Sequence, residues 1–290
     1  MNLSSLTRRD FVRLGAGAAA ASFASGSLSG APLNRPIGLQ LYSVRNLLPK
    51  DFDGTLRQLH EAGYREVEAA GYFNKPAAEF RHAMDQAGLR CISAHHTLTE
   101  FRSRLDELIE FAHTLGLEYL ICSSSGGVHR NPNAKGEELT LDDWRFVAGE
   151  FNRIGAKLKS AGITFGMHNH IPEFAVENGV VVYDELLRLT DPEHVVFEMD
   201  CGWVTAAGHN PVDYLRKTPE RFPLLHVKDM AREAGGKFHS VVLGTGVIDY
   251  RPILRAATGL KHFFIEQEEF AGDPMTELRA DADYMRKLDV

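Results

Sequence analysis

The chain has 290 residues, of which 44% are hydrophobic, 24% charged and 9% aromatic, and its formal net charge is −7. These proportions are ordinary for a globular protein, and they exclude a collagen-like, disordered or disulfide-rich chain. The acidic balance also provides no overall basic surface for nucleic acid. The 13 histidines are numerous, and they are unevenly placed along the chain.

The first 31 residues have the pattern of an export signal. Arg8 and Arg9 precede Phe11, and a short stretch of small apolar residues follows at 14–21. A basic segment before such a stretch is typical of a signal peptide, and the paired arginines resemble the twin-arginine (Tat) signal. The stretch is shorter than the roughly 20 residues of a membrane-spanning helix. We therefore expect cleavage of residues 1–31 and export to the periplasm without a stable membrane anchor; an amphipathic N-terminal helix is the alternative.

Removal of residues 1–31 would change the charge of the working protein. The mature chain would carry 29 basic and 38 acidic residues, a net charge of −9. A Tat signal would export the protein already folded, which suits a protein that captures a metal before it leaves the cytoplasm. The three cysteines form no CxxC motif, and we expect them to be small buried hydrophobic residues: Cys91, Cys122 and Cys201.

Short apolar runs and segments of helical period alternate along the rest of the chain. The predicted strands are 37–42, 66–70, 91–94, 119–123, 164–168, 195–199, 224–227 and 263–266. The predicted helices are 52–62, 77–87, 101–115, 142–161, 183–189, 212–216, 250–257 and 274–288. Four of these helices are followed by a glycine that leads directly into the next strand: Gly63, Gly88, Gly116 and Gly162.

Eight strand–helix repeats within residues 36–290 predict a single α/β domain. Alternating strands and helices favour a parallel sheet, and eight repeats in this length favour a closed, eight-stranded (β/α)8 TIM barrel over an open doubly wound sheet. No GxGxxG motif follows the first strand, which argues against a dinucleotide-binding domain. The longest predicted loop, 124–139, follows the fourth strand and could cover the mouth of the barrel.

Ionisable side chains gather at the carboxyl ends of the predicted strands, where the active sites of such barrels lie. Strand five ends at His168 and is followed by His170, strand six ends near Asp200, and strand seven ends with His226 and Lys228. Residues two apart in a strand face the same side, so His168 and His170 point the same way, as do His226 and Lys228. Burial of so many ionisable groups is costly unless they pair with one another or bind a metal. A mixed set of His, Asp and Glu favours Zn²⁺, Mn²⁺ or Fe²⁺ over Ca²⁺.

Seven segments in order along residues 36–290 resemble the xylose isomerase-like TIM barrel superfamily, the sugar phosphate isomerase/epimerase group. They are GLQLYS at 38–43, GYREVE at 63–68, HNHIPEF at 168–174, MDCGW at 199–203, HVKD at 226–229, GTGVIDY at 244–250 and FIEQE at 264–268. The occurrence of both HVKD and HNHxxEF in one chain makes the signal specific.

The resemblance implies a divalent metal, Mn²⁺, Zn²⁺, Co²⁺ or Mg²⁺, held at the ends of strands five to eight. Asp200, His226 and Glu266 match the family's ligands directly. The fourth ligand of the family is a Glu, and His168 stands in its place. Because the family's epimerases exchange a proton between two carboxylates, this replacement argues against symmetric two-base epimerisation.

The remaining site residues are assigned by their chemistry. We expect Lys228 to stabilise a developing oxyanion, with His170 or Glu173 as the general base and Glu266 catalytic by analogy with the family. Gln40, Glu68 and His95 are expected, with Glu173, to bind the hydroxyl groups of a sugar. Two alternatives remain open: Lys228 could form a strand-end ion pair with Asp229, and Glu68 could pair with a basic residue in the lumen.

These features predict a metal-dependent isomerase or epimerase that abstracts a proton beside the carbonyl of an unphosphorylated sugar, keto-sugar or cyclitol. A lyase or hydratase for 3-keto-glycosides is the alternative enzyme, and a non-catalytic periplasmic sugar-binding barrel is an alternative of another class. A relative of the family's DNA-repair endonucleases is opposed by the net charge. We therefore expect a small carbohydrate as the partner and no nucleic acid, with a homodimer left open.

Overall fold

The computed structural model describes residues 34–136 and 138–290, so the predicted export signal lies outside the described residues. Eight parallel strands close into a barrel in the order β1-β2-β3-β4-β5-β8-β9-β12. Their bounds are Gly38–Gln40 (β1), Glu66–Ala69 (β2), Arg90–Thr97 (β3), Tyr119–Ser124 (β4), Thr164–His168 (β5), Val195–Asp200 (β8), Leu224–Val227 (β9) and His262–Ile265 (β12). This confirms the predicted (β/α)8 barrel.

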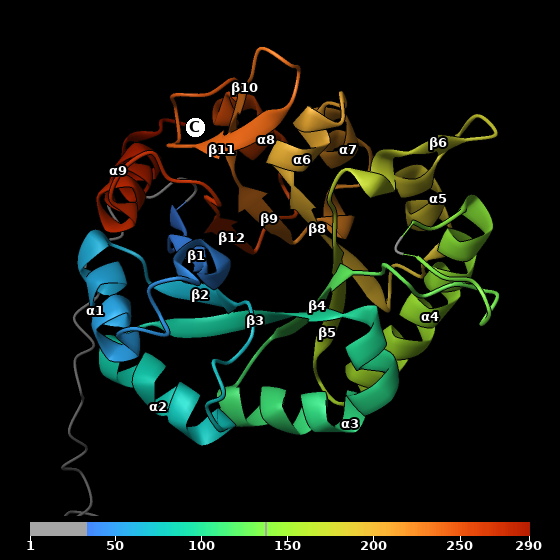
Figure 1. Cartoon of the computed structure of the whole chain (residues 1–290), viewed down its shortest axis with the longest axis horizontal. Helices are drawn as coiled ribbons and strands as arrows, with labels where there is room; N and C mark the ends of the chain where they lie inside the picture. Colours follow the sequence, from blue (N-terminus) through green and yellow to red (C-terminus); the bar gives the residue numbers. More distant parts are fainter. Residues whose placement is uncertain (1–33, 137) are drawn as a thin grey trace, which may run out of the picture.

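Helices surround the barrel on its outside (Figure 1). Their bounds are Phe52–Ala62 (α1), Ala77–Ala87 (α2), Leu98–Leu115 (α3), Leu141–Ser160 (α4), Val182–Leu189 (α5), Cys201–Ala206 (α6), Pro211–Lys217 (α7), Tyr250–Ala256 (α8) and Pro274–Lys287 (α9). Helix α6 was not predicted, because it begins directly after β8 and leaves no loop to mark its start. None of the described helices is both long and apolar enough to span a membrane.

Two small antiparallel hairpins extend from the carboxyl end of the barrel and were not predicted. One pairs β6 (Val176–Glu177) with β7 (Val180–Val181), and the other pairs β10 (Asp229–Arg232) with β11 (Phe238–Val241). The second hairpin begins immediately after β9, with one residue between the strands. Both lie in the loops that follow barrel strands, and therefore at the end where the polar side chains gather.

Apolar side chains fill the amino-terminal half of the barrel lumen. Phe264 of β12, Leu224 of β9 and Ile121 of β4 form a buried cluster with Ile92 and Tyr119. Gly166 on β5 makes room for it, because a Cβ atom there would lie 2.6 Å from Cδ1 of Ile121. The lumen is therefore a packed core below the polar layer and not an open channel. The three cysteines are buried and free, as expected.

Candidate active site

Four of the predicted residues converge at the carboxyl end of the lumen. His168, Asp200, His226 and Glu266, called here the outer group, come from or directly follow β5, β8, β9 and β12, and each offers a ligand atom within 4.8 Å of the others. Nδ1 of His226 lies 3.0 Å from Oε2 of Glu266 and 3.9 Å from Oδ2 of Asp200. All four side chains are buried. The closed barrel thus brings together ligands that the sequence spreads over almost 100 residues.

The outer group fits a divalent metal by its chemistry. Two imidazoles and two carboxylates are donors that Zn²⁺, Mn²⁺ and related ions accept. Oδ2 of Asp200 is buried and accepts no hydrogen bond of good geometry, although the ammonium group of Lys228 forms an ion pair with it at 2.9 Å. Oδ1 of Asp200 accepts a bond from the backbone N–H of Trp203 and caps α6, which fixes the carboxylate in place. A cation at the outer group would complete the contacts of this aspartate.

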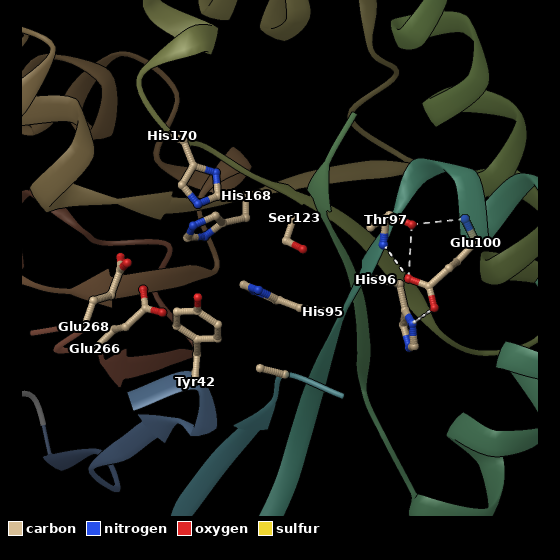
Figure 2. A pocket seen from close by; sticks show the side chains of 11 residues that line it. Tyr42, His95, His96, Thr97, Glu100, Ser123, His168, His170, Glu266 and Glu268 are labelled. Carbon is tan, nitrogen blue, oxygen red and sulfur yellow. Dashed lines mark hydrogen bonds and ion pairs between the residues drawn. The ribbon is translucent and has the colours of Figure 1, made fainter. Parts of the chain in front are cut away.

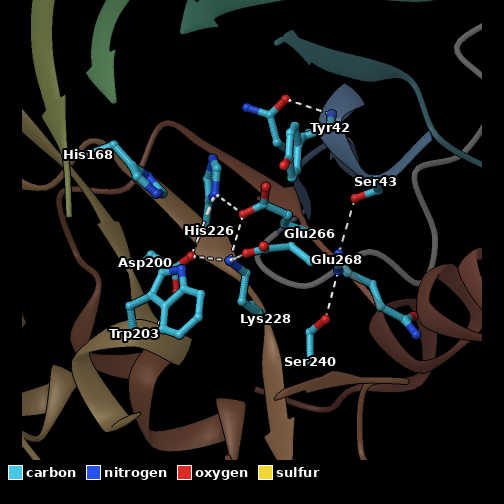
Figure 3. A network of polar contacts seen from close by, with 12 residues as sticks. Tyr42, Ser43, His168, Asp200, Trp203, His226, Lys228, Ser240, Glu266 and Glu268 are labelled. Atoms are coloured by element: carbon cyan, nitrogen blue, oxygen red, sulfur yellow. Dashed lines mark hydrogen bonds and ion pairs between the residues drawn. The ribbon is translucent and has the colours of Figure 1, made fainter. Parts of the chain in front are cut away.

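Lys228 lies against the same carboxylates (Figure 3). Its Nζ atom is 2.9 Å from Asp200, 2.8 Å from Glu266 and 2.5 Å from Glu268, and it also stacks over the ring of Trp203. Burial alone would lower the pKa of Lys228, but the three carboxylates outweigh it and raise the pKa above its usual value. The ammonium group is fully buried and is not part of the pocket wall. Lys228 therefore balances these carboxylates from behind the pocket wall, and it would act on a developing oxyanion through its charge and not by direct contact.

Asp229 and Lys228 do not form the strand-end ion pair that was left open. The carboxylate of Asp229 accepts hydrogen bonds from the backbone N–H groups of Met230, Gly244, Gly246 and Ile248. It therefore anchors the loop before α8. Four backbone donors to one buried carboxylate make this a structural role.

A second layer of ionisable groups lies deeper in the lumen. Glu68 is completely buried and accepts hydrogen bonds from Gln40 at 2.7 Å and Ser93 at 2.5 Å, while its Oε2 lies 2.7 Å from Nε2 of His226. Burial would raise the pKa of Glu68, but His95 and His226 hold it well below its usual range. Neither Gln40 nor Glu68 lines the pocket.

Gln40 and Glu68 were expected to bind the hydroxyl groups of a sugar, and the structure places both outside the pocket wall. They lie below the floor of the pocket, where they hold His95 and His226 in position. The partners of Glu68 are histidines, and not the lumen Arg or Lys that was the alternative. His95 does line the pocket, and its pKa is raised to about 9 because Glu68 and Glu198 outweigh the effect of burial.

A cavity of about 280 Å³ opens above these layers (Figure 2). Its wall includes three histidines of the predicted site and two carboxylates that follow β12, among these residues: Tyr42, His95, His96, Glu100, Ser123, His168, His170, Glu266 and Glu268. Figure 2 shows His170 above His168, with Glu266 and Glu268 on the neighbouring wall. This volume suits a molecule about the size of a monosaccharide or a cyclitol.

Two titratable groups on this wall have pKa values shifted in opposite directions. Burial and the nearby Lys228 lower the pKa of His170 to about 4, so its imidazole is uncharged. Burial raises the pKa of Glu268, and Glu266 adds to the rise, while Lys228 opposes it. His170 can therefore accept a proton, and Glu268 is protonated more readily than an ordinary glutamate.

Glu173 lies beside the pocket and belongs to an adjoining cavity. One of its carboxylate oxygens accepts a hydrogen bond from the backbone N–H of His170 at 2.8 Å, and burial raises the pKa of the carboxyl group to about 7. The adjoining cavity of about 590 Å³ is lined by Glu173, Trp144 and Ile171, and it shares His170 and Ser123 with the pocket. Glu173 thus positions the His170 backbone and faces the second cavity.

Two site residues had no role in the sequence prediction. Glu268 stood in the run after strand eight, where nothing distinguishes it from Glu269, yet only Glu268 lines the pocket. Glu198 precedes Asp200 by two residues on β8, so both face the lumen. The same-face spacing was the available signal for Glu198.

Known proteins resemble this chain in sequence and fold. The family described as xylose isomerase-like TIM barrel matches residues 56–288. An inosose dehydratase from Geobacillus kaustophilus (strain HTA426) is 25% identical over 269 residues, which cover 81% of this chain and 87% of that protein. The crystal structure of a sugar phosphate isomerase/epimerase from Parabacteroides distasonis ATCC 8503 matches with a TM-score of 0.76 and 25% identity, covering 91% of this chain and 96% of that one.

A metal is present in a more distant structural match. The crystal structure of the IOLI protein with a bound zinc atom has a TM-score of 0.67 and 12% identity, covering 87% of this chain and 98% of that one. At this identity the match shows a common fold. The zinc belongs to that protein. For this chain, a metal site is argued from its own candidate ligands.

Proposed function

Because the chain belongs to the xylose isomerase-like TIM barrel family, we propose that it is a metal-dependent lyase that removes water from an unphosphorylated keto-sugar or keto-cyclitol. One observation carries the proposal: the pocket wall pairs an uncharged imidazole, His170, with a carboxyl group of raised pKa, Glu268. Elimination of water needs one base and one acid of this kind. The relatives named inosose dehydratase support a cyclitol ketone as the substrate class.

The first step is removal of a proton from the carbon beside the carbonyl. His170 accepts this proton on its free ring nitrogen, and the carbonyl oxygen gains negative charge. Positive charge on His95 and on the buried Lys228 stabilises that oxygen. A divalent ion held by His168, Asp200, His226 and Glu266 would polarise the same carbonyl as a Lewis acid.

The second step expels the hydroxyl group from the next carbon. Glu268 donates a proton to the departing oxygen, so the hydroxyl leaves as water and an unsaturated ketone remains. Lys228 holds the Glu268 carboxyl group in place through its contact at 2.5 Å. His170 then returns its proton to solvent and Glu268 regains one, so the site is restored without any change in oxidation state.

Charge on the pocket wall supports an unphosphorylated substrate. Glu100 and Glu266 both line the cavity, and a phosphate group would be repelled by these two carboxylates. The one lysine of the site, Lys228, is already paired with three carboxylates. A neutral polyhydroxy ketone meets the hydrogen-bonding groups of this pocket without that repulsion.

An isomerase or epimerase is the second candidate, supported by the similarity to the Parabacteroides distasonis protein. In that reaction Glu266 would act as the second base. Burial would raise the pKa of Glu266, but Lys228 and His226 hold it well below its usual range. Glu266 is therefore ionised and already paired with His226 and Lys228, which favours the lyase over two-base exchange.

The test is the mass of the product. Metal-loaded protein should convert an inosose to a product lighter by one water, and His170→Gln should lower kcat by about 10²–10⁴-fold because the base is lost. His82→Gln, an exposed histidine on α2, is the matched control and should leave kcat unchanged. A product of unchanged mass would instead support the isomerase. Binding of keto-sugars and cyclitols with no turnover would contradict both enzymes and support the sugar-binding barrel.

We also propose, from the sequence pattern alone, that the Tat signal directs the protein to the periplasm. Replacement of both Arg8 and Arg9 by lysine should leave the uncleaved precursor in the cytoplasm. Cell fractionation with an antibody to the barrel measures this. Unchanged export of the double variant would contradict the proposal.

A further inference from the structure

A second group of ligands lies deeper in the lumen than the outer group. His95, His168, Glu198 and His226, called here the deeper group, each offer a ligand atom within 4.8 Å of the others. They come from β3, β5, β8 and β9, and Glu198 sits directly beside His168 in the register of β5 and β8. Glu198 precedes Asp200 by two residues on its strand, which places it further from the mouth.

Three imidazole nitrogens converge on one carboxylate oxygen of the deeper group. Oε2 of Glu198 lies 2.7 Å from Nε2 of His95, 3.2 Å from Nδ1 of His168 and 3.2 Å from Nε2 of His226. A tetrahedral ion with metal–ligand distances of about 2.0–2.1 Å separates its ligand atoms by roughly 3.3 Å. The contacts of Oε2 with His168 and His226 are close to this separation, and the contact with His95 would have to lengthen by about 0.6 Å.

The other carboxylate oxygen of Glu198 has no partner. Glu198 is completely buried, and its Oε1 atom accepts no hydrogen bond from any described residue. An unsatisfied buried carboxylate oxygen is costly. A metal ion in the deeper group could be bound by one oxygen or both, and it would supply the missing interaction.

The deeper group also differs from the outer group in its counter-charge. In the outer group the ammonium of Lys228 already lies within 2.9 Å of both Asp200 and Glu266. Among the described residues no lysine or arginine forms an ion pair with Glu198, whose charged partners are histidines. The carboxylate of Glu198 in the deeper group is thus buried without a lysine or arginine beside it.

We propose that His95, His168, Glu198 and His226 form a metal site of their own, deeper than the outer group and suited to zinc. Three imidazoles and one carboxylate are nitrogen-rich donors, which favour Zn²⁺ over Mg²⁺ or Ca²⁺. Nε2 of His226 serves this site, while Nδ1 of the same ring faces Glu266 of the outer group. Oε2 of Glu68 lies 2.9 Å from Nε2 of His95 and 2.7 Å from Nε2 of His226, so a zinc ion on these two nitrogens would replace the protons that they share with Glu68.

This ion would connect four strands of the barrel, β3, β5, β8 and β9. It would also replace the proton of His95 as the positive charge at the pocket floor. The inference depends on the ligand geometry and not on the lyase reaction proposed above. A bound zinc ion without dehydratase activity would therefore overturn the proposed function and leave this inference intact.

Zinc titration of the full-length protein tests the site. The chain is stripped with a chelator and titrated in competition with a chromogenic zinc chelator. Glu198→Gln keeps the volume of the side chain but should lower the zinc affinity at least tenfold, whereas Asp200→Asn should still bind one zinc ion tightly. Glu66→Gln is the matched control, because Glu66 is also buried and contacts a histidine, His262, at the other end of the barrel. It should bind zinc like the wild type.

Anomalous scattering at the zinc edge places the ion in crystals of the wild type, so the test stands even if Glu198→Gln fails to fold. The expected peak lies between His95 and Glu198. Wild-type zinc affinity in Glu198→Gln would overturn the proposal. A peak bounded by Asp200 and Glu266 alone, or no zinc at all, would also overturn it.

Discussion

The two ends of the barrel lumen are built from the same strands with opposite chemistry. On β9, Leu224 lies in the apolar cluster at the amino-terminal end, and His226, two residues on, lies among the ionisable groups. On β12, Phe264 belongs to the apolar cluster and Glu266 follows at the outer group. Two residues along a strand, about 7 Å, are enough to pass from a packed core to a polar site.

The difference separates what holds the barrel together from what it does. The apolar end stabilises the closed sheet through buried apolar surface, and its side chains pack only against other side chains of the barrel. The polar end concentrates carboxylates, histidines and one lysine that are costly to bury and that stabilise one another only in part. Substitutions at the polar end should therefore abolish chemistry with little effect on folding, and substitutions at the apolar end should do the reverse.

The largest effect is expected from Asp200→Asn. The variant removes one negative ligand from the outer group, so metal occupancy of that group should fall and kcat should drop by about 10³-fold or more. Asn is as good a helix cap as Asp, so α6 should keep its cap and the free energy of unfolding should change little. Steady-state kinetics and urea unfolding measure the two quantities.

Asp249→Asn is the control for that variant. Asp249 caps α8 in the same way, but it is exposed and is not among the residues that line the pocket. It should leave kcat and bound metal unchanged. If Asp200→Asn is as active as the wild type, the claim that the polar end of the lumen carries the chemistry is contradicted.

A smaller effect, on stability alone, is expected from Phe264→Ala. Phe264 is completely buried against Ile92, Ile121 and Leu224, and its loss should destabilise the fold by about 3–5 kcal/mol through lost apolar burial and a cavity. Zinc affinity and kcat of the folded variant should stay within a factor of a few of the wild type. Val247→Ala, at an exposed apolar side chain, should be nearly neutral. A large loss of zinc affinity in folded Phe264→Ala would show that the two ends are coupled.

Fold and site differ in how well the sequence predicts them. The eight strands are predicted because each is a buried apolar run bounded by turn or helix signals. The β6–β7 hairpin is missed because its strands have two residues each, exposed in β6 and half-buried in β7, so they have no periodicity to detect. Helix α6 and strand β10 are missed because they follow barrel strands with at most one residue between.

The sequence does not predict how deep in the lumen a side chain lies. Gln40 is the last residue of β1 and Glu68 the last but one of β2, close to the strand ends that His168 and Asp200 occupy, yet neither Gln40 nor Glu68 lines the pocket. Depth depends on the stagger of neighbouring strands, and the register shifts between Val67 and Glu68 where β2 pairs with β3. A two-residue period assigns a side chain to the lumen but does not give its layer.

The smallest predicted effect is a pH dependence of the stability, caused by a residue that lies outside both ends of the barrel lumen. Burial raises the pKa of Asp281 on α9 to about 7, while its carboxylate accepts a hydrogen bond from the backbone N–H of Leu243. The folded chain therefore binds more protons than the unfolded chain between about pH 4 and 7, and stability falls as the pH rises through this window, by on the order of 2–4 kcal/mol.

Asp281→Asn should remove that fall, because the amide stays neutral and its oxygen can still accept the bond from Leu243. Urea unfolding at pH 5 and pH 8 measures the change. Asp283→Asn, at a half-exposed side chain on the same helix, is the control. If the free energy of unfolding of Asp281→Asn still differs between pH 5 and pH 8 as much as that of the wild type, another group causes the difference.

Hydrogen exchange at the substrate carbon tests the central claim most directly, namely that the polar end of the barrel removes a proton beside a carbonyl. Metal-loaded protein is incubated with an inosose in D₂O and followed by NMR. We predict that the proton beside the carbonyl is lost, with deuterium appearing there or the unsaturated ketone accumulating, and that the rate falls on chelation and in Asp200→Asn. Retention of that proton by the metal-loaded protein, or an equal rate after chelation and in Asp200→Asn, would contradict the claim.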